Sequence, residues 1–143
     1  MSNVNKSVIV PYSASQMFTL VNNIADYPIF LPWCKTSHII KQTAAEITAS
    51  LTLAKGGIQK SFTTCNRIQL NKMIEVRLLD GPFKHLEGFW QFEAISENSC
   101  RITFNLEFEF TNKLLSLAFG SVFQQVTQTL VEAFTKRAEE IYG

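Results

Sequence analysis

The chain has 143 residues, of which 46% are hydrophobic and 17% charged, and 13 Lys and Arg stand against 12 Asp and Glu. This balance argues against a disordered chain. The net charge of +1 argues against a surface that grips nucleic acid as a whole, so no DNA partner is expected. The length predicts a single domain over residues 1–143.

The three cysteines, Cys34, Cys65 and Cys100, are far apart and odd in number, which argues against a secreted disulfide framework. Residues 1–6 lack the basic-then-apolar pattern of a signal peptide. No apolar run approaches the roughly 20 residues of a membrane span. We therefore expect a reduced, cytoplasmic protein whose contact with the inner membrane, if it makes one, is peripheral and transient.

The first part of the chain predicts a strand and two short helices. Residues 6–10 are rich in β-branched side chains, which predicts a strand. Ser13 and Gln16 have the spacing of a capping box, which predicts that a helix begins there. Asp26 precedes Tyr27 and Pro28, so it is expected to cap a second short helix that ends before Pro32.

The middle of the chain predicts six strands joined by tight turns. The clearest pattern is the alternation of apolar and polar residues over 102–110, which predicts one buried and one wet face. Tight turns make neighbouring strands antiparallel. The six predicted strands span residues 37–41, 47–53, 58–68, 73–79, 86–92 and 102–110.

The apolar period changes to that of a helix from Lys113 to Tyr142, a stretch without proline that Asn112 can cap. One helix of this length would extend about 45 Å. Gly120 inside it costs about 1 kcal/mol relative to Ala, which we interpret as close backbone packing or a bend. The fold class is therefore α+β, with a curved antiparallel sheet of about seven strands wrapped around a long C-terminal helix and two short helices after the first strand. A twisted sheet curls, so a cavity can lie under the helix.

Metal chemistry has one weak candidate. Cys34 and His38 are four residues apart, which on a helix would place two ligands on one face. Pro32 and the β-branched residues that follow predict no helix there. We expect no metal site.

Catalytic chemistry also has one weak candidate. Asp80, His85 and Glu87 could form an acid/base group at the mouth of a cavity. Asp80 better suits a turn with Gly81, however, and Glu87 is out of phase with the apolar residue Leu86. Phosphate-binding loops, nucleophile elbows and dinucleotide fingerprints are absent from the sequence. We expect no catalytic residues and no enzyme.

Several motifs resemble the ubiquinone-binding START-like family, which is related to polyketide cyclases and dehydrases. The resemblance extends over essentially the whole chain and points to a bacterial branch that includes a ribosome association toxin. The matching segments are residues 26–28, 30–34, 57–58, 62–64, 80–84, the set 86, 88, 90 and 92, and residues 108–114, 118–120, 133–134 and 137–138.

The resemblance implies a helix-grip (START/Bet v 1-like) fold and a binding function of one of two kinds. The first is a hydrophobic cavity for ubiquinone or a related prenylated lipid in support of respiration, with no obligatory cofactor. The second is binding to the large (50S) ribosomal subunit, which blocks 70S formation. A cyclase- or dehydrase-like enzyme is a third alternative, and it would need polar groups that converge inside the cavity.

One position departs from this branch, which commonly has Arg after the Phe-Thr-Thr motif, where this chain has Cys65. Arg67, two residues later and in phase, could take its place in contacting RNA or an anionic group.

The expected site residues form two sets. The first set is apolar and is expected to line the cavity: Leu31, Trp33, Phe83, Leu86, Trp90, Phe104, Phe108, Phe119, Val122, Phe123 and Val126. The second set forms a basic rim for RNA or another anion, because alternate turns of a meander gather at one end of the sheet: Lys55, Lys60, Arg67, Lys84 and Lys113. Ordinary core packing and solvated lysines are the alternative interpretations of the two sets.

Overall fold

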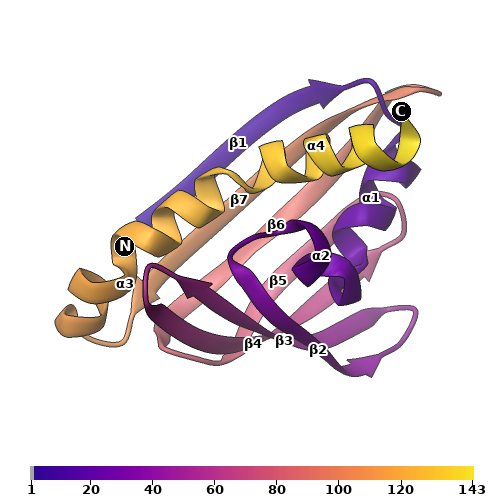
Figure 1. Ribbon diagram of the computed structural model, residues 1–143. Helices are drawn as coiled ribbons and strands as arrows, with labels where there is room; N and C mark the ends of the chain where they lie inside the picture. The colour runs from indigo at the N-terminus through magenta and orange to yellow at the C-terminus, as the bar shows by residue number, and fades with distance from the viewer. Residues whose placement is uncertain (1) are drawn as a thin grey trace.

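A computed structural model describes residues 2–143 as a seven-stranded antiparallel sheet in the order β1-β7-β6-β5-β4-β3-β2, with helices over one face (Figure 1). The strands are β1 (Ser2–Val10), β2 (Cys34–Gln42), β3 (Glu46–Lys55), β4 (Ile58–Gln69), β5 (Met73–Asp80), β6 (Phe83–Ser96) and β7 (Ser99–Phe110). The helices are α1 (Ala14–Asn22), the 3-10 helix η1 (Ile24–Asp26), α2 (Tyr27–Phe30), α3 (Lys113–Gln128) and α4 (Leu130–Tyr142). The expected α+β arrangement is confirmed.

Local hydrogen bonds begin the first helices, one as expected and one not. The Ser13 hydroxyl oxygen accepts from the Gln16 backbone N–H at 3.1 Å, and the Gln16 side chain accepts from the Ser13 N–H at 2.9 Å, which confirms the capping box of α1. Asp26 is the N-cap residue of α2 as expected, but its side chain makes no capping hydrogen bond. Its carboxylate instead accepts from the Asn23 side-chain amide at 3.0 Å, so it stabilises the preceding turn.

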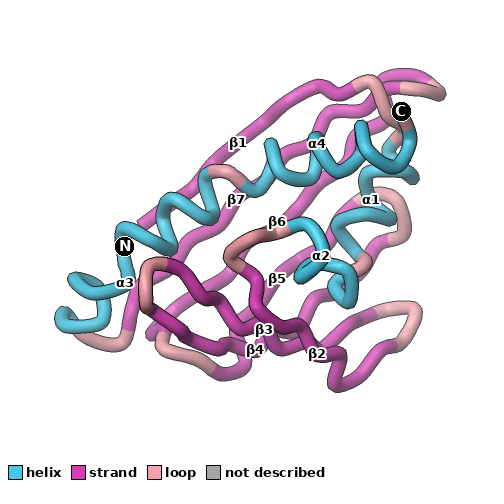
Figure 2. The backbone as a smooth tube through the Cα atoms, in the orientation of Figure 1, coloured by secondary structure: helices cyan, strands magenta, loops and turns pink. Residues whose placement is uncertain are grey.

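β7 lies next to the edge of the sheet, where it pairs with the edge strand β1 on one side and with β6 on the other. Its alternate residues are buried from Cys100 to Phe110 and face α3 and α4, as the period of two predicts. Figures 1 and 2 show the two helices lying across this face of the sheet. Within residues 2–143, none of the helices combines the length and the apolar character that a membrane crossing requires.

The predicted single C-terminal helix is interrupted at Thr129, where α3 ends and α4 begins (Figure 2). The Thr129 hydroxyl donates to the carbonyls of Gln125 and Val126, at 3.2 and 3.0 Å, and its backbone N–H donates to Val126. Such back-bonding tightens a helical turn and bends the axis. The interruption therefore lies at a threonine, a residue that gives no strong signal for a break in the sequence.

Close packing excludes a side chain at Gly88 and not at Gly120. The expected close packing at Gly120 is therefore wrong. A Cβ at Gly120 would lie 3.6 Å from Ser116 Oγ and 3.8 Å from Phe110, which is ordinary contact. A Cβ at Gly88 would lie 2.0 Å from the Asn105 backbone oxygen, because β6 and its paired strand β7 approach each other closely there. A side chain cannot be added there unless the two strands separate.

We predict opposite effects of alanine at these two glycines. Gly88→Ala should lower the free energy of unfolding by about 3 kcal/mol, because the strands must move apart. Gly120→Ala should raise it by about 0.5–1 kcal/mol, because alanine favours the helix and meets no clash. Urea unfolding of both variants measures this. A Gly88→Ala variant as stable as the wild type would show that the close approach of β6 and β7 does not exclude a side chain at this position.

Candidate functional site

A cavity of about 90 Å³ lies between the inner face of the sheet and α3 and α4. Most of its lining is aliphatic or aromatic and comes from β3, β4, β6, β7 and both helices. The predicted lining residues that reach it are Trp33, Leu86, Trp90, Phe104, Phe123 and Val126. The others, Leu31, Phe83, Phe108, Phe119 and Val122, do not border this cavity and pack elsewhere in the apolar interior.

A cluster of phenylalanines explains why part of the predicted set is core. Phe123 contacts Phe83 and Phe108 with ring centroids 4.9 and 4.7 Å apart, and Phe119 packs on Phe110 at 5.6 Å. These rings fill the space beneath the start of α3, where the sequence suggested the mouth of a cavity. The cavity therefore lies deeper, toward α4.

A second aromatic cluster closes the other end. Trp90 stacks on Phe104 at 4.3 Å and meets Phe134 edge-on at 5.3 Å, and Tyr27 contacts the same phenylalanine at 5.4 Å. Between the two clusters, the half-buried side chains of Trp33, Leu51 and Leu130 leave the lining partly open to solvent.

Three polar residues, Thr64, Asn66 and Thr127, are buried in the described chain, and all three line this cavity. The Thr64 hydroxyl donates to Asn66 Oδ1 at 2.9 Å, so the Asn66 amide nitrogen keeps its two N–H donors for another partner. The Thr127 hydroxyl is already used, since it donates to the Phe123 carbonyl at 2.9 Å. None of these three residues was predicted from the sequence.

Tyr27 is the titratable group among the lining residues of the described chain. Its hydroxyl donates to the Val21 carbonyl. Burial, and secondly the nearby Cys34, raise the pKa of Tyr27 above its usual value. Burial also raises the pKa of the Cys34 thiol to about 11. Both groups are therefore protonated at neutral pH.

The expected basic rim is partly assembled. The Thr111 N–H donates to the Pro82 carbonyl at 3.1 Å, which joins the β5–β6 turn to the start of α3. Lys55 donates to the Gln125 side chain at 3.3 Å, which joins the β3–β4 turn to the same helix. The exposed lysines Lys55, Lys60, Lys84 and Lys113 thus lie on elements that meet at this end of the sheet.

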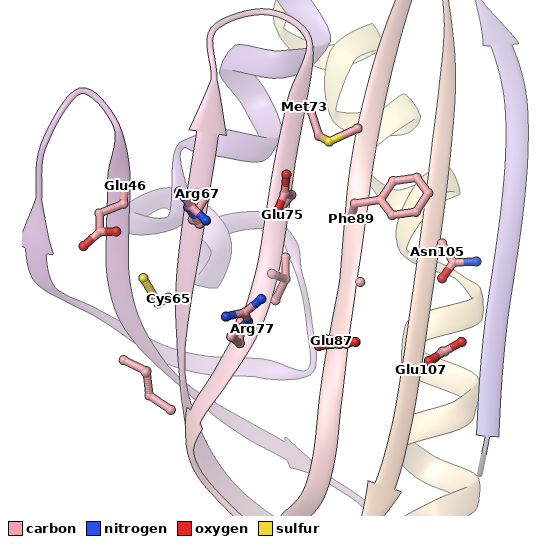
Figure 3. Close-up of a pocket in the computed structure, with 13 residues that line it drawn as sticks. Glu46, Cys65, Arg67, Met73, Glu75, Arg77, Glu87, Phe89, Asn105 and Glu107 are labelled. Carbon is pink, nitrogen blue, oxygen red and sulfur yellow. The ribbon is translucent and has the colours of Figure 1, made fainter.

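Arg67 lies apart from these lysines, on the outer face of the sheet. It lines a groove of about 700 Å³ together with Cys65 and Arg77 (Figure 3), so Arg67 and Cys65 do share a face. Its register partners are Glu46 on β3 and Glu75 on β5, which balance its charge. Arg67 therefore belongs to a groove of mixed charge.

Of the sequence candidates for acid/base chemistry, His85 and Glu87 lie on the outer face beside Glu107, whereas Asp80, the last residue of β5, is not part of this group. His85 Nε2 lies 3.7 Å from a Glu107 carboxylate oxygen and 4.0 Å from one of Glu87, and the three side chains are partly exposed. Their ligand atoms are close enough together for a metal ion. None of the three lines the apolar cavity, so they cannot act on a molecule held there.

Comparison with known proteins places this geometry in a family. Residues 10–135 match the family described as polyketide cyclase / dehydrase and lipid transport. The chain is 49% identical over 143 residues to the ribosome association toxin RatA of Escherichia coli (strain K12), covering 100% of this chain and 90% of that protein.

Two further similarities are more distant. The mitochondrial coenzyme Q-binding protein COQ10 homolog B of Xenopus laevis is 29% identical over 145 residues, covering 97% of this chain and 59% of that protein. A START superfamily protein from Mycobacterium smegmatis has the same fold, with a TM-score of 0.81 and 20% identity over 97% of this chain and 98% of the other. The expected START-like helix-grip fold is confirmed.

We predict that a thiol reagent at mildly alkaline pH modifies Cys65 in the native protein but not Cys34 or Cys100. Cys65 is half-buried at the outer groove, whereas the other two are buried and burial raises their pKa values, so little thiolate forms. Cys65→Ser should remove the fast reaction, and the other two thiols should react only in denaturant. Fast labelling that survives in Cys65→Ser would contradict this assignment.

Proposed function

The chain belongs to the polyketide cyclase, dehydrase and lipid transport family, and we propose that it is a non-enzymatic protein that binds a quinone-type lipid in its apolar cavity. One observation carries the proposal: the buried polar residues of the described chain all line that cavity. Polar groups are costly to bury, so their convergence at one apolar site is typical of ligand recognition.

The chemistry of a quinone suits this lining. A quinone ring is flat and largely apolar, and its carbonyl oxygens accept hydrogen bonds. The Asn66 amide nitrogen can donate to such an oxygen, because the bond from Thr64 holds the amide oxygen away. Leu86, Leu106 and Val126 supply apolar contacts for the ring. The name of the coenzyme Q-binding relative supports the same ligand class.

The cavity must widen to take such a ligand. Its volume of about 90 Å³ is well below the roughly 300–1,000 Å³ of most small-molecule sites. Val126, Thr127 and Leu130 line it and flank the interruption at Thr129. Movement of α3 about this junction would enlarge the cavity without unfolding either helix. The prenyl tail of the ligand would then extend out of the cavity past the half-buried side chains of Trp33 and Leu51.

A binding role is favoured over catalysis because the lining has little acid/base capacity. Tyr27 is its titratable residue, and its raised pKa keeps it protonated and bonded to the Val21 carbonyl. General acid/base catalysis works best with a pKa near the working pH. A cyclase- or dehydrase-like activity therefore has weaker support from the residues of this cavity.

Ribosome association is the second candidate function. Its support is the 49% identity, over the full chain, to a protein named for that activity. The exposed lysines Lys55, Lys60, Lys84 and Lys113 would supply contacts to RNA phosphates. We propose the large ribosomal subunit as the partner. The two functions use different parts of the molecule, so single variants can separate them.

We predict that Asn66→Leu weakens binding of a short-chain ubiquinone about tenfold, because a hydrogen bond to the head is removed. Ala49→Phe should abolish binding, because the new ring would occupy the cavity that Ala49 borders. Asn105→Leu, the same change as at Asn66 but in the outer groove, is the matched control and should bind normally. Native mass spectrometry gives the bound fraction. Equal uptake by all the variants would exclude this cavity as the site.

We predict that Lys84→Glu combined with Lys113→Glu weakens binding to the large subunit. It should also lower the salt dependence of binding, by about one unit of slope for each phosphate that the protein no longer neutralises. Lys41→Glu combined with Lys72→Glu changes the net charge equally at the opposite end and should bind as the wild type does. Sedimentation with purified subunits at several salt concentrations measures both. Unchanged binding by the first pair would remove the basic rim from the interface.

A further inference from the structure

Two leucines at the start of α3 are exposed to an unusual degree. Leu114 and Leu117 have 77% and 81% of their surfaces accessible, and they are three residues apart, so they share one side of the helix. The opposite side carries Leu115 and Phe119, which pack on the apolar interior. Figures 1 and 2 show these first turns projecting beyond the end of the sheet. The two leucines therefore have no partner in the described chain and point away from the core.

The charges around these leucines are mainly positive. α3 contains Lys113 and no acidic residue from Lys113 to Gln128. Lys84, on the strand next to the end of β7, is exposed at the same end, and Lys55, which is bonded to Gln125, lies further along the same helix. The carboxylates on the adjoining strand ends are those of Asp80 and Glu109. Along this side of α3 the three lysines, Lys55, Lys84 and Lys113, thus outnumber the two carboxylates.

We propose that this tip, formed by Leu114 and Leu117 with Lys84 and Lys113, docks on an anionic lipid bilayer, with Lys55 further along α3 as an additional cation. A bilayer offers the two chemistries that the tip needs, since hydrocarbon accepts the leucines and anionic headgroups attract the lysines. The long lysine stems reach the headgroup layer while the helix tip enters the interface. RNA phosphates would satisfy the lysines but would leave both leucines in water. The leucines therefore distinguish docking on a lipid surface from contact with RNA, for which the lysines alone would suffice.

Docking in this way would bring the cavity close to its source of ligand. The Lys55 ammonium binds Gln125, one residue before the cavity-lining Val126, so the helix that carries the tip leads directly to the cavity. A lipid that leaves the bilayer would meet α3 at this point. This role of docking, the collection of a ligand from the bilayer, rests on the proposed ligand-binding function. The docking itself needs no ligand and can be measured with the cavity empty.

Flotation with lipid vesicles tests the proposal. The wild type should float with phosphatidylcholine vesicles that contain phosphatidylglycerol and much less with phosphatidylcholine alone. Leu114→Gln combined with Leu117→Gln should reduce binding at least about tenfold, since neither leucine can then be buried in the bilayer. Lys84→Gln combined with Lys113→Gln should reduce it about fivefold for each lysine. Glutamine preserves helix propensity at these exposed positions.

Matched controls separate docking from the other functions. Ile29→Gln combined with Leu70→Gln removes two exposed apolar residues, 67% and 74% accessible, outside the tip and should leave vesicle binding unchanged. Ala49→Phe, which fills the cavity, should also float normally, so failure of the ligand proposal would not affect this result. Wild-type protein that ignores anionic vesicles would overturn the proposal. The proposal would also be overturned if Leu114→Gln combined with Leu117→Gln floated normally. The same holds if this variant lost binding to ribosomal subunits but kept its binding to vesicles.

Discussion

The strict alternation of β7 is the constraint on which the rest of the structure depends. Its inner side chains are apolar from Cys100 to Phe110, so that face must be covered, and α3 and α4 follow it directly in the chain. Because β7 also pairs with β1 and β6, the same strand joins the two ends of the sequence. At Gly88, β6 approaches β7 so closely that a side chain has no room. The position of the two C-terminal helices follows from how this one strand is buried.

The cavity is a consequence of uneven filling under that cover. Phenylalanines around Phe123 fill one end, and the cluster around Trp90 fills the other. The middle holds smaller or polar side chains, among them Thr64 and Asn66, which cannot pack as densely. Aromatic residues thus form the two ends of the cavity, and the free space lies between the two aromatic clusters. This arrangement places the free space beside Thr64 and Asn66.

The order of elements could be predicted because each has a local signal, such as the capping box at Ser13 or the alternation of β7. Features set by tertiary contacts could not. β1 begins at Ser2 because it pairs with β7 as far as Phe108, and nothing in residues 2–5 alone indicates this. The interruption at Thr129 depends on which carbonyls its hydroxyl reaches. Threonine is compatible with a helix, so its presence alone does not predict a break.

The candidate site was harder to predict than the fold, yet part of its signal was present. Phe83 and Phe108 have the right phase to line a cavity, but only three-dimensional packing shows that they fill space with each other. Thr64 and Asn66 were overlooked, although they share the inner phase of β4 with Phe62. A polar residue on an apolar face costs stability unless it has a partner. Such an exception to the alternation is therefore a better guide to a binding site than the apolar residues that obey it.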